Sequence, residues 1–164
     1  MLACVCKDAA DALLASKWGA AVRVDRSGVV REPAGAFDVT VAPGEGVQAA
    51  VDACPPGGRV LLLPGVHEGP LVLSAQEVHV FGRGLAVLRA AEGAVLTILS
   101  ALATVDGLVV RNEMSIEPND DDDGIYAVWI RGGGLRLQAC DLVSNAGTCV
   151  RIEGGANATV VSCR

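Results

Sequence analysis

Trp129 stands among charged residues whose spacing places them on neighbouring strands. Arg131, Arg151 and Glu153 fall on the same expected outer face, and Tyr126 lies close by along the chain. An exposed tryptophan flanked by charges is suited to stacking on a sugar ring or anchoring a partner peptide. The alternative is that the loop before Tyr126 folds back and covers Trp129. These five residues form the candidate binding site.

An acidic run, "NDDDDG", precedes this site. Asn119, Asp121, Asp123 and Gly124 match offsets 1, 3, 5 and 6 of a calcium-binding loop, which uses oxygen ligands. The acidic ligand expected at offset 12 is missing, because Ile130 stands there. A solvated loop of mutually repelling carboxylates is the alternative interpretation. We therefore expect no cofactor, with calcium as the one candidate.

Composition excludes several classes of function. The net charge is −6 and no basic run exceeds two residues, which argues against nucleic-acid binding, where affinity comes mainly from phosphate neutralisation. No stretch of 18 apolar residues occurs, so we expect no membrane span. The N-terminus lacks the basic region of a signal peptide. We expect a cytoplasmic protein whose partner is another protein or a glycan.

The cysteines lack CxxC pairs and metal-ligand spacing. In a reducing compartment they are expected to be small buried hydrophobes with free thiols rather than disulfides or zinc ligands. The six are Cys4, Cys6, Cys54, Cys140, Cys149 and Cys163.

A repeat in the second half of the chain supplies the elements that position these residues. Four segments begin at Gly69, Gly93, Gly124 and Gly147, in steps of 24, 31 and 23 residues, and the long step contains the extra segment "EMSIEPNDDDD". Each segment contains two stretches of alternating apolar residues, which predicts two β-strands with an inner and an outer face. The apolar positions align in four columns: Leu71, Leu96, Val128 and Val150; Leu73, Ile98, Ile130 and Ile152; Val78, Ala103, Leu135 and Ala158; and Val80, Val105, Leu137 and Val160.

Short strands that recur every 23–25 residues without intervening helices are typical of a parallel β-helix, in which each turn bonds to the next. Stacked aliphatic columns explain why 51% of residues are hydrophobic but only 3% are aromatic. A third short strand is indicated by the inward column of Leu108, Cys140 and Cys163. We expect an all-β solenoid of about four turns.

The stretch "VQAAVDACPPGG" predicts a single helix before the first strand. Val47, Ala50, Val51 and Cys54 follow helical spacing, and the proline–glycine turn at 55–58 ends the helix. An open end of a solenoid exposes backbone groups and core side chains. We therefore interpret the helix as a cap over the first turn.

The chain divides into two parts on this basis. Residues 1–45 are expected to form a helix, a hairpin around residues 26–28 and a strand in "FDVTVAP", all near the cap. Residues 46–164 hold the capping helix and the turns. No cap is evident at "VVSCR", so we expect a piece of a longer protein or an open last turn that pairs with another copy.

Two motifs resemble the right-handed parallel β-helix superfamily that includes pectate lyases and pectin methylesterases. The opening "TVAPGEGVQAAVDACPPGGRVLLLPGVHEGPLVL" is similar to the start "IQxAIDxAPxGxxIxLxPGxYxE", with His67 where an aromatic Tyr is common. The segment "VDGLVVRN" is similar to the recurrent "VxGLxIxN". The resemblance implies a right-handed parallel β-helix, a fold shared by carbohydrate-active enzymes, surface proteins and the β-helix modules of F-box adaptors.

The resemblance also implies a candidate catalytic set. Asp106, Arg136 and Gln138 fall on one outer face, and in pectin methylesterases an Asp attacks the ester while a Gln helps to bind the oxyanion. A second Asp for acid–base catalysis is missing from this face, and Asp106 directly before Gly107 also fits a turn. A lyase would need calcium-binding carboxylates across stacked turns, which the sequence does not offer.

We therefore expect a non-catalytic module that binds a protein or a carbohydrate through one outer face. A polysaccharide esterase or lyase is the alternative from another class. A self-associating scaffold is the third.

Overall fold

A computed structural model describes residues 23–24, 30–31, 36–74, 77–82, 85–99, 102–114, 126–145 and 148–164. These residues form sixteen strands and one short helix. The bounds are β1 Arg23–Val24, β2 Val30–Arg31, β3 Val39–Val41, α2 Val47–Asp52, β4 Gly58–Leu62, β5 Gly65–Glu68, β6 Leu71–Leu73, β7 Val78–Gly82, β8 Ala86–Ala90, β9 Leu96–Ile98, β10 Leu102–Asp106, β11 Val109–Asn112, β12 Val128–Ile130, β13 Gly134–Gln138, β14 Asp141–Ser144, β15 Val150–Ile152 and β16 Asn157–Val161.

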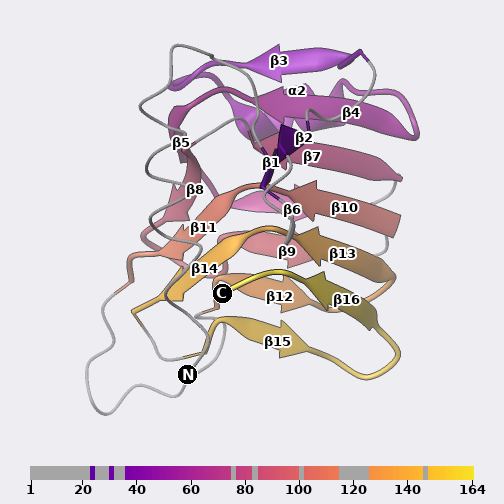
Figure 1. Cartoon of the computed structure of the whole chain (residues 1–164). Coiled ribbons are helices and arrows are strands. Elements are labelled where there is room, and N and C mark those ends of the chain that lie inside the picture. Colours follow the sequence, from indigo (N-terminus) through magenta and orange to yellow (C-terminus); the bar gives the residue numbers. More distant parts are fainter. Residues whose placement is uncertain are drawn as a thin grey trace.

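Three parallel sheets surround one core, as the stack of strands in Figure 1 shows. Sheet I has the spatial order β16-β13-β10-β7-β4-β3, sheet II has β14-β11-β8-β5, and sheet III has β15-β12-β9-β6. The chain visits sheets I, II and III in turn and then returns one level further along. This is a parallel β-solenoid of about five turns. The sequence predicts this fold class correctly, but it predicts about four turns, one for each repeat.

The register of the strands confirms all four predicted columns. In sheet III, Val128 pairs with Leu96 on one side and with Val150 on the other. In sheet I, Leu135 likewise lies between Ala103 and Ala158. Because side chains alternate between faces, this register places every aliphatic column toward the axis.

The interior is filled by these columns. Ile98, Ile130 and Leu137 of these columns are each fully buried, as are Leu62 of β4 and Leu88 of β8. Complete burial of such a side chain contributes about 1.5–3 kcal/mol, so the stacked columns are the main source of stability.

The corners between sheets bring the backbones of neighbouring turns into close contact. A Cβ atom added to Gly82, at the end of β7, would lie 2.1 Å from the carbonyl oxygen of Gly107 in the next turn. A Cβ added to Gly132 would lie 2.2 Å from the carbonyl oxygen of Leu99. Glycine is therefore required at both corners.

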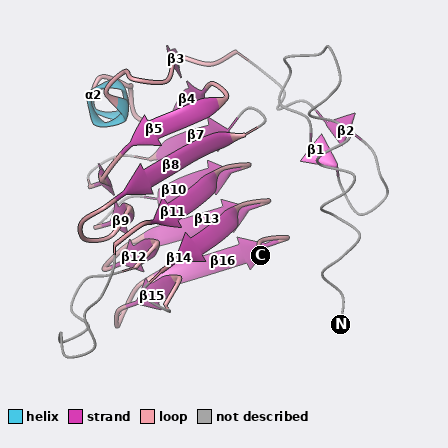
Figure 2. Cartoon of the chain, turned by 90° about the vertical axis from the view of Figure 1, so that its left-hand side faces the viewer, coloured by secondary structure: helices cyan, strands magenta, loops and turns pink. Residues whose placement is uncertain are grey.

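Helix α2 lies at the β3–β4 end of the solenoid (Figure 2). Its residues Val47 and Val51 are buried in the core cluster, as is Cys54 just beyond it. The Gln48 side chain donates to the carbonyl oxygen of Val72 (3.1 Å) and accepts from the Val72 N–H (2.8 Å), which satisfies part of the outer edge of β6. The interpretation of α2 as a cap for the whole end stays a prediction.

The N-terminal segment is described only in part. β1 and β2 pair antiparallel, with Arg23 opposite Arg31, on either side of the residues at which the hairpin turn is expected. β3 is the strand expected in "FDVTVAP", and it extends sheet I by pairing with β4. The helix expected near residue 10 lies outside the described residues. No helix in the described ranges has the length and apolar character needed to cross a membrane.

Candidate binding site on the outer face of sheet III

Strand β12 presents Trp129 outward because its neighbours are apolar. Val128 and Ile130 are fully buried, so the residue between them must face away from the axis. In the parallel register, Trp129 lies opposite Arg151 of β15. Residues of two successive turns, those of β12 and β15, are therefore neighbours around Trp129.

Contacts within the cluster hold Trp129 in one position. Its Nε1–H donates to Oε1 of Glu153 at 3.1 Å. The Arg131 guanidinium lies 4.5 Å from the centroid of the indole ring, and its Nε donates to Oε2 of Glu153 at 3.4 Å. Glu153 thus links two residues of one turn to the next, and the stacked arginine covers one face of the indole.

Tyr126 and Arg151 complete the cluster. The rings of Tyr126 and Trp129 are tilted at 59°, with centroids 6.0 Å apart. The Arg151 guanidinium lies 5.2 Å from the Tyr126 ring and donates to the Tyr126 hydroxyl. Tyr126 is only 2% exposed, although the sequence places it in an exposed patch. Its burial makes it a support for Trp129 and Arg151 rather than a contact surface.

The structure therefore brings together all five residues of the candidate binding site. The Arg131 side chain is 49% exposed and that of Glu153 is 33% exposed, while Trp129 is half-buried. The described side chains of the cluster include two guanidinium groups and one carboxylate, in a chain of net charge −6. Guanidinium groups bind carboxylates and phosphates through parallel hydrogen bonds, which suits an acidic partner.

The candidate catalytic residues also lie together, on sheet I. Asp106 is opposite Gln138 in the register, and Arg136 Nε donates to Gln138 Oε1 at 3.2 Å. Asp106, however, is only 3% exposed, whereas Arg136 is exposed. A carboxylate nucleophile must reach an ester bond, and Asp106 is not accessible to a polymer in this conformation. The catalytic role of these residues stays a prediction.

The calcium candidates Asn119, Asp121 and Asp123 lie outside the described residues. Within the part of the chain that the structure describes, no group of three or more His, Cys, Asp or Glu side chains is placed to hold a metal ion.

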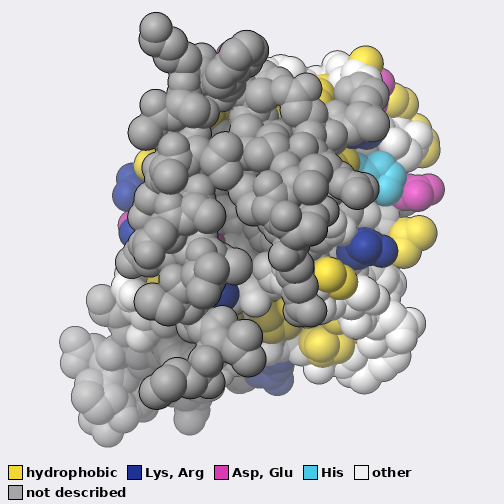
Figure 3. All heavy atoms as spheres, in the orientation of Figure 1, with side chains coloured by type: hydrophobic (Ala, Val, Ile, Leu, Met, Phe, Trp, Pro, Cys, Tyr) yellow, Lys and Arg dark blue, Asp and Glu magenta, His cyan; other side chains and the backbone are white. Residues whose placement is uncertain are grey.

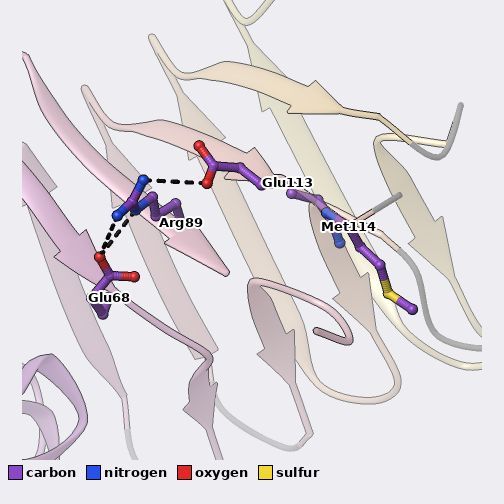
Figure 4. A network of polar contacts seen from close by, with 5 residues as sticks. Glu68, Arg89, Glu113 and Met114 are labelled. Atoms are coloured by element: carbon purple, nitrogen blue, oxygen red, sulfur yellow. Dashed lines mark hydrogen bonds and ion pairs between the residues drawn. The ribbon is translucent and has the colours of Figure 1, made fainter. Parts of the chain in front are cut away.

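Sequence patterns missed a polar network on the outer face of sheet II, which Figure 4 shows. Arg89 Nη2 and Nε bind Oε1 of Glu68 at 2.8 and 3.0 Å, and Nη1 binds Oε2 of Glu113 at 3.3 Å. The hydrogen bond to Glu68 raises the pKa of Arg89 above its usual value. The network joins three successive turns and pairs one guanidinium with two carboxylates at the exposed surface, so each ion pair contributes little to stability.

Two buried polar side chains were also not expected inside. His67 is fully buried, and its Nε2 lies 2.8 Å from the Leu63 carbonyl oxygen. The Asn112 amide donates to the carbonyl oxygens of Gly93 (2.7 Å) and Tyr126 (3.1 Å) and accepts from the Met114 N–H. Asn112 therefore holds the backbone of Tyr126, one of the five residues of the candidate binding site, in place.

No large patch of one kind is visible where Figure 3 shows described residues. Basic, acidic, histidine and hydrophobic side chains are interspersed along the right-hand side of that view.

No family model matches the chain, and neither a curated protein nor a solved structure matches it.

Proposed function

We propose that the chain is a non-catalytic interaction module that binds an acidic segment of a protein partner at the Trp129 cluster. The observation that carries this proposal is the preorganised set of Trp129, Arg131, Arg151 and Glu153 on two adjacent turns. Tryptophan and arginine are the residues that most often dominate binding energy at protein interfaces. Side chains that are already fixed lose little entropy when a partner binds.

The contacts of the indole favour a protein over a sugar. Stacking on a sugar ring requires an open aromatic face. Arg131 covers one face of Trp129, Tyr126 lies beside it, and Nε1 is bonded to Glu153. The Arg131 side chain is 49% exposed, and its guanidinium offers N–H groups that favour the carboxylates of Asp and Glu side chains.

The opening motif, the segment "VDGLVVRN" and the solenoid support a distant relation to the pectin lyase-like β-helix superfamily, including its non-enzymatic F-box-type modules. We include this relation in the proposal because a shared fold hosts both enzymes and binding modules. The burial of Asp106 favours the binding modules.

A peptide array that varies acidic and aromatic residues tests the proposal. Selected peptides are expected to contain carboxylates, and Trp129→Ala should raise their Kd about 30-fold or more, as for a typical interface hot spot. Arg131→Glu reverses an exposed charge without opening the core and should abolish binding. Thr97→Ala, on the neighbouring strand β9 of the same face, is the matched control and should leave Kd within about twofold.

Other outcomes would contradict the proposal. Peptides that bind Trp129→Ala and Arg131→Glu as tightly as the unaltered chain would remove this face as the site. Binding confined to a glycan array would favour the carbohydrate alternative. Products from pectin or alginate, with or without calcium, that disappear in Asp106→Asn would establish the enzyme alternative instead.

A second candidate function is self-association through β15 and β16. Ile130 and Leu137 are fully buried, yet their counterparts in the next turn, Ile152 and Val160, are 52% and 51% exposed. We propose that a second copy of the chain covers these outermost apolar residues. Light scattering should then show a mass that rises with concentration and falls in Ile152→Lys; a monomer at every concentration would reject this candidate.

A further inference from the structure

Two cysteines stack on each other in successive turns. Cys140 precedes β14, and Cys163 follows β16 at the equivalent corner one turn further along. The backbone between them is paired, because Arg164 N–H donates to the Cys140 carbonyl oxygen at 3.1 Å and Leu142 N–H donates to that of Arg164 at 2.8 Å. Neighbouring strands lie about 4.8 Å apart, which is within the Cα separation that disulfides span.

The two corners have the same local conformation. The residues before the cysteines, Ala139 and Ser162, both adopt a left-handed backbone, with φ of 51° and 55°. Their equivalent geometry directs both thiols into the same column. The Cys140 N–H donates to Sγ of Cys163 at 3.4 Å, so the Cys163 sulfur lies against the backbone of Cys140.

The pair is asymmetric in burial and in ionisation. Cys140 is 2% exposed, and its thiol donates to the Gln138 carbonyl oxygen at 3.3 Å, whereas Cys163 is half-buried. The hydrogen bond from Cys140 lowers the pKa of the Cys163 thiol to about 6, while the same contact and burial raise the pKa of Cys140. Cys163 is therefore the first of the two to become a nucleophilic thiolate.

We propose that Cys163 and Cys140 form a redox-active pair: Cys163 reacts with a small-molecule disulfide, and Cys140 then resolves the adduct as a disulfide between two successive turns. This function is separate from the proposed binding at Trp129. It differs from the expectation of simple buried thiols, because Sγ of Cys163 lies 3.4 Å from the backbone nitrogen of Cys140 across adjacent turns.

The chemistry balances in two exchange steps. The Cys163 thiolate attacks one sulfur of the small disulfide, whose S–S bond breaks and releases one thiolate that takes up a proton. Cys140 then loses its proton and attacks Sγ of Cys163, so that the protein S–S bond forms and the second small thiolate leaves and is protonated. Two protein thiols are oxidised and one disulfide is reduced to two thiols.

Exposure of the full chain to oxidised glutathione tests the pair. Tryptic cleavage after Arg136 and Arg151 gives one peptide with Cys140 and Cys149 and a second peptide with Cys163. Non-reducing mass spectrometry should show these two peptides joined with the loss of two hydrogen atoms. In Cys140→Ala, the link should disappear and a glutathionyl group should accumulate on Cys163, at least tenfold above the unaltered chain.

Matched variants make each outcome decisive. Cys149→Ser should retain the link, which assigns it to Cys140, and Cys163→Ala should show neither the link nor an adduct on Cys140. If circular dichroism shows that Cys140→Ala is unfolded, Cys140→Ser replaces it. A link that persists without Cys140, a link lost in Cys149→Ser, or the absence of any adduct on Cys163 when Cys140 is removed would overturn the proposal.

Discussion

At the scale of single residues, one corner of the solenoid repeats a backbone conformation with different side chains. Gly107, Ala139 and Ser162 occupy this corner in three successive turns, with φ of 70°, 51° and 55°. Glycine adopts a left-handed conformation without penalty, whereas an L-residue with a Cβ atom pays about 1–2 kcal/mol. The last two turns therefore carry local strain that the earlier turn avoids.

Ala139→Gly is expected to stabilise the protein by about 1 kcal/mol, because it removes this strain. The midpoint and slope of urea unfolding give the free energy. Ala158→Gly is the control, since Ala158 lies in the extended strand β16, where glycine destabilises by about 0.5–1 kcal/mol. Equal destabilisation by both changes would show that Ala139 is not left-handed.

At the scale of elements, Gln48 joins helix α2 to the outer strand of sheet III. Its side-chain amide bonds both the N–H and the carbonyl oxygen of Val72, the two backbone groups that another strand would otherwise pair with. We expect Gln48→Ala to lower the free energy of unfolding by about 1–2 kcal/mol, because each lost bond contributes about 1 kcal/mol.

The control for Gln48 is Asp52→Ala. Asp52 Oδ1 accepts an exposed hydrogen bond from Nε2 of Gln48 at 2.8 Å, within the same helix. Thermal and urea unfolding should show a change within about 0.5 kcal/mol for this variant. Comparable losses in both variants would mean that Val72 does not depend on Gln48.

Strand prediction succeeded in the two alternating stretches of each repeat; it failed at β5, where turn residues dominate, and at β8, whose alternation was overlooked. Alternation placed β6, β7, β9, β10, β12 and β13 in register, because a shift by one residue would reverse their faces. β5 and β8 were not recognised. The segment "GVHEG" around β5 has the composition of a turn, and it becomes a strand because His67 points inward and bonds Leu63. Such tertiary contacts have no local signal.

At the scale of the whole molecule, the spacing between turns depends on glycine at the corners. Gly82→Ala should destabilise the protein by about 3 kcal/mol, because the added Cβ would overlap the Gly107 carbonyl oxygen and push two turns apart. Gly154→Ala is the matched control: nothing lies within 4 Å of its Cβ position. Its unfolding free energy should change by less than about 0.5 kcal/mol.

The candidate site was predictable in its position and not in its contacts. The repeat brings Trp129 beside Arg151, because strict periodicity aligns their strands. The diagonal bond from Trp129 to Glu153 and the burial of Tyr126 depend on rotamers and on packing between turns, which no repeat encodes. The burial of Asp106, which decides between the binding and the catalytic interpretation, likewise depends on packing between turns and could not be predicted from the repeat.

The whole account requires β12 to lie between β9 and β15 in parallel register. Nuclear Overhauser contacts of the Val128 backbone in isotopically labelled protein measure this arrangement directly. We predict inter-strand contacts from Val128 to both Leu96 and Val150. Contacts to one of the two alone, or an antiparallel pattern between β12 and β13, would contradict the solenoid and the Trp129 site together.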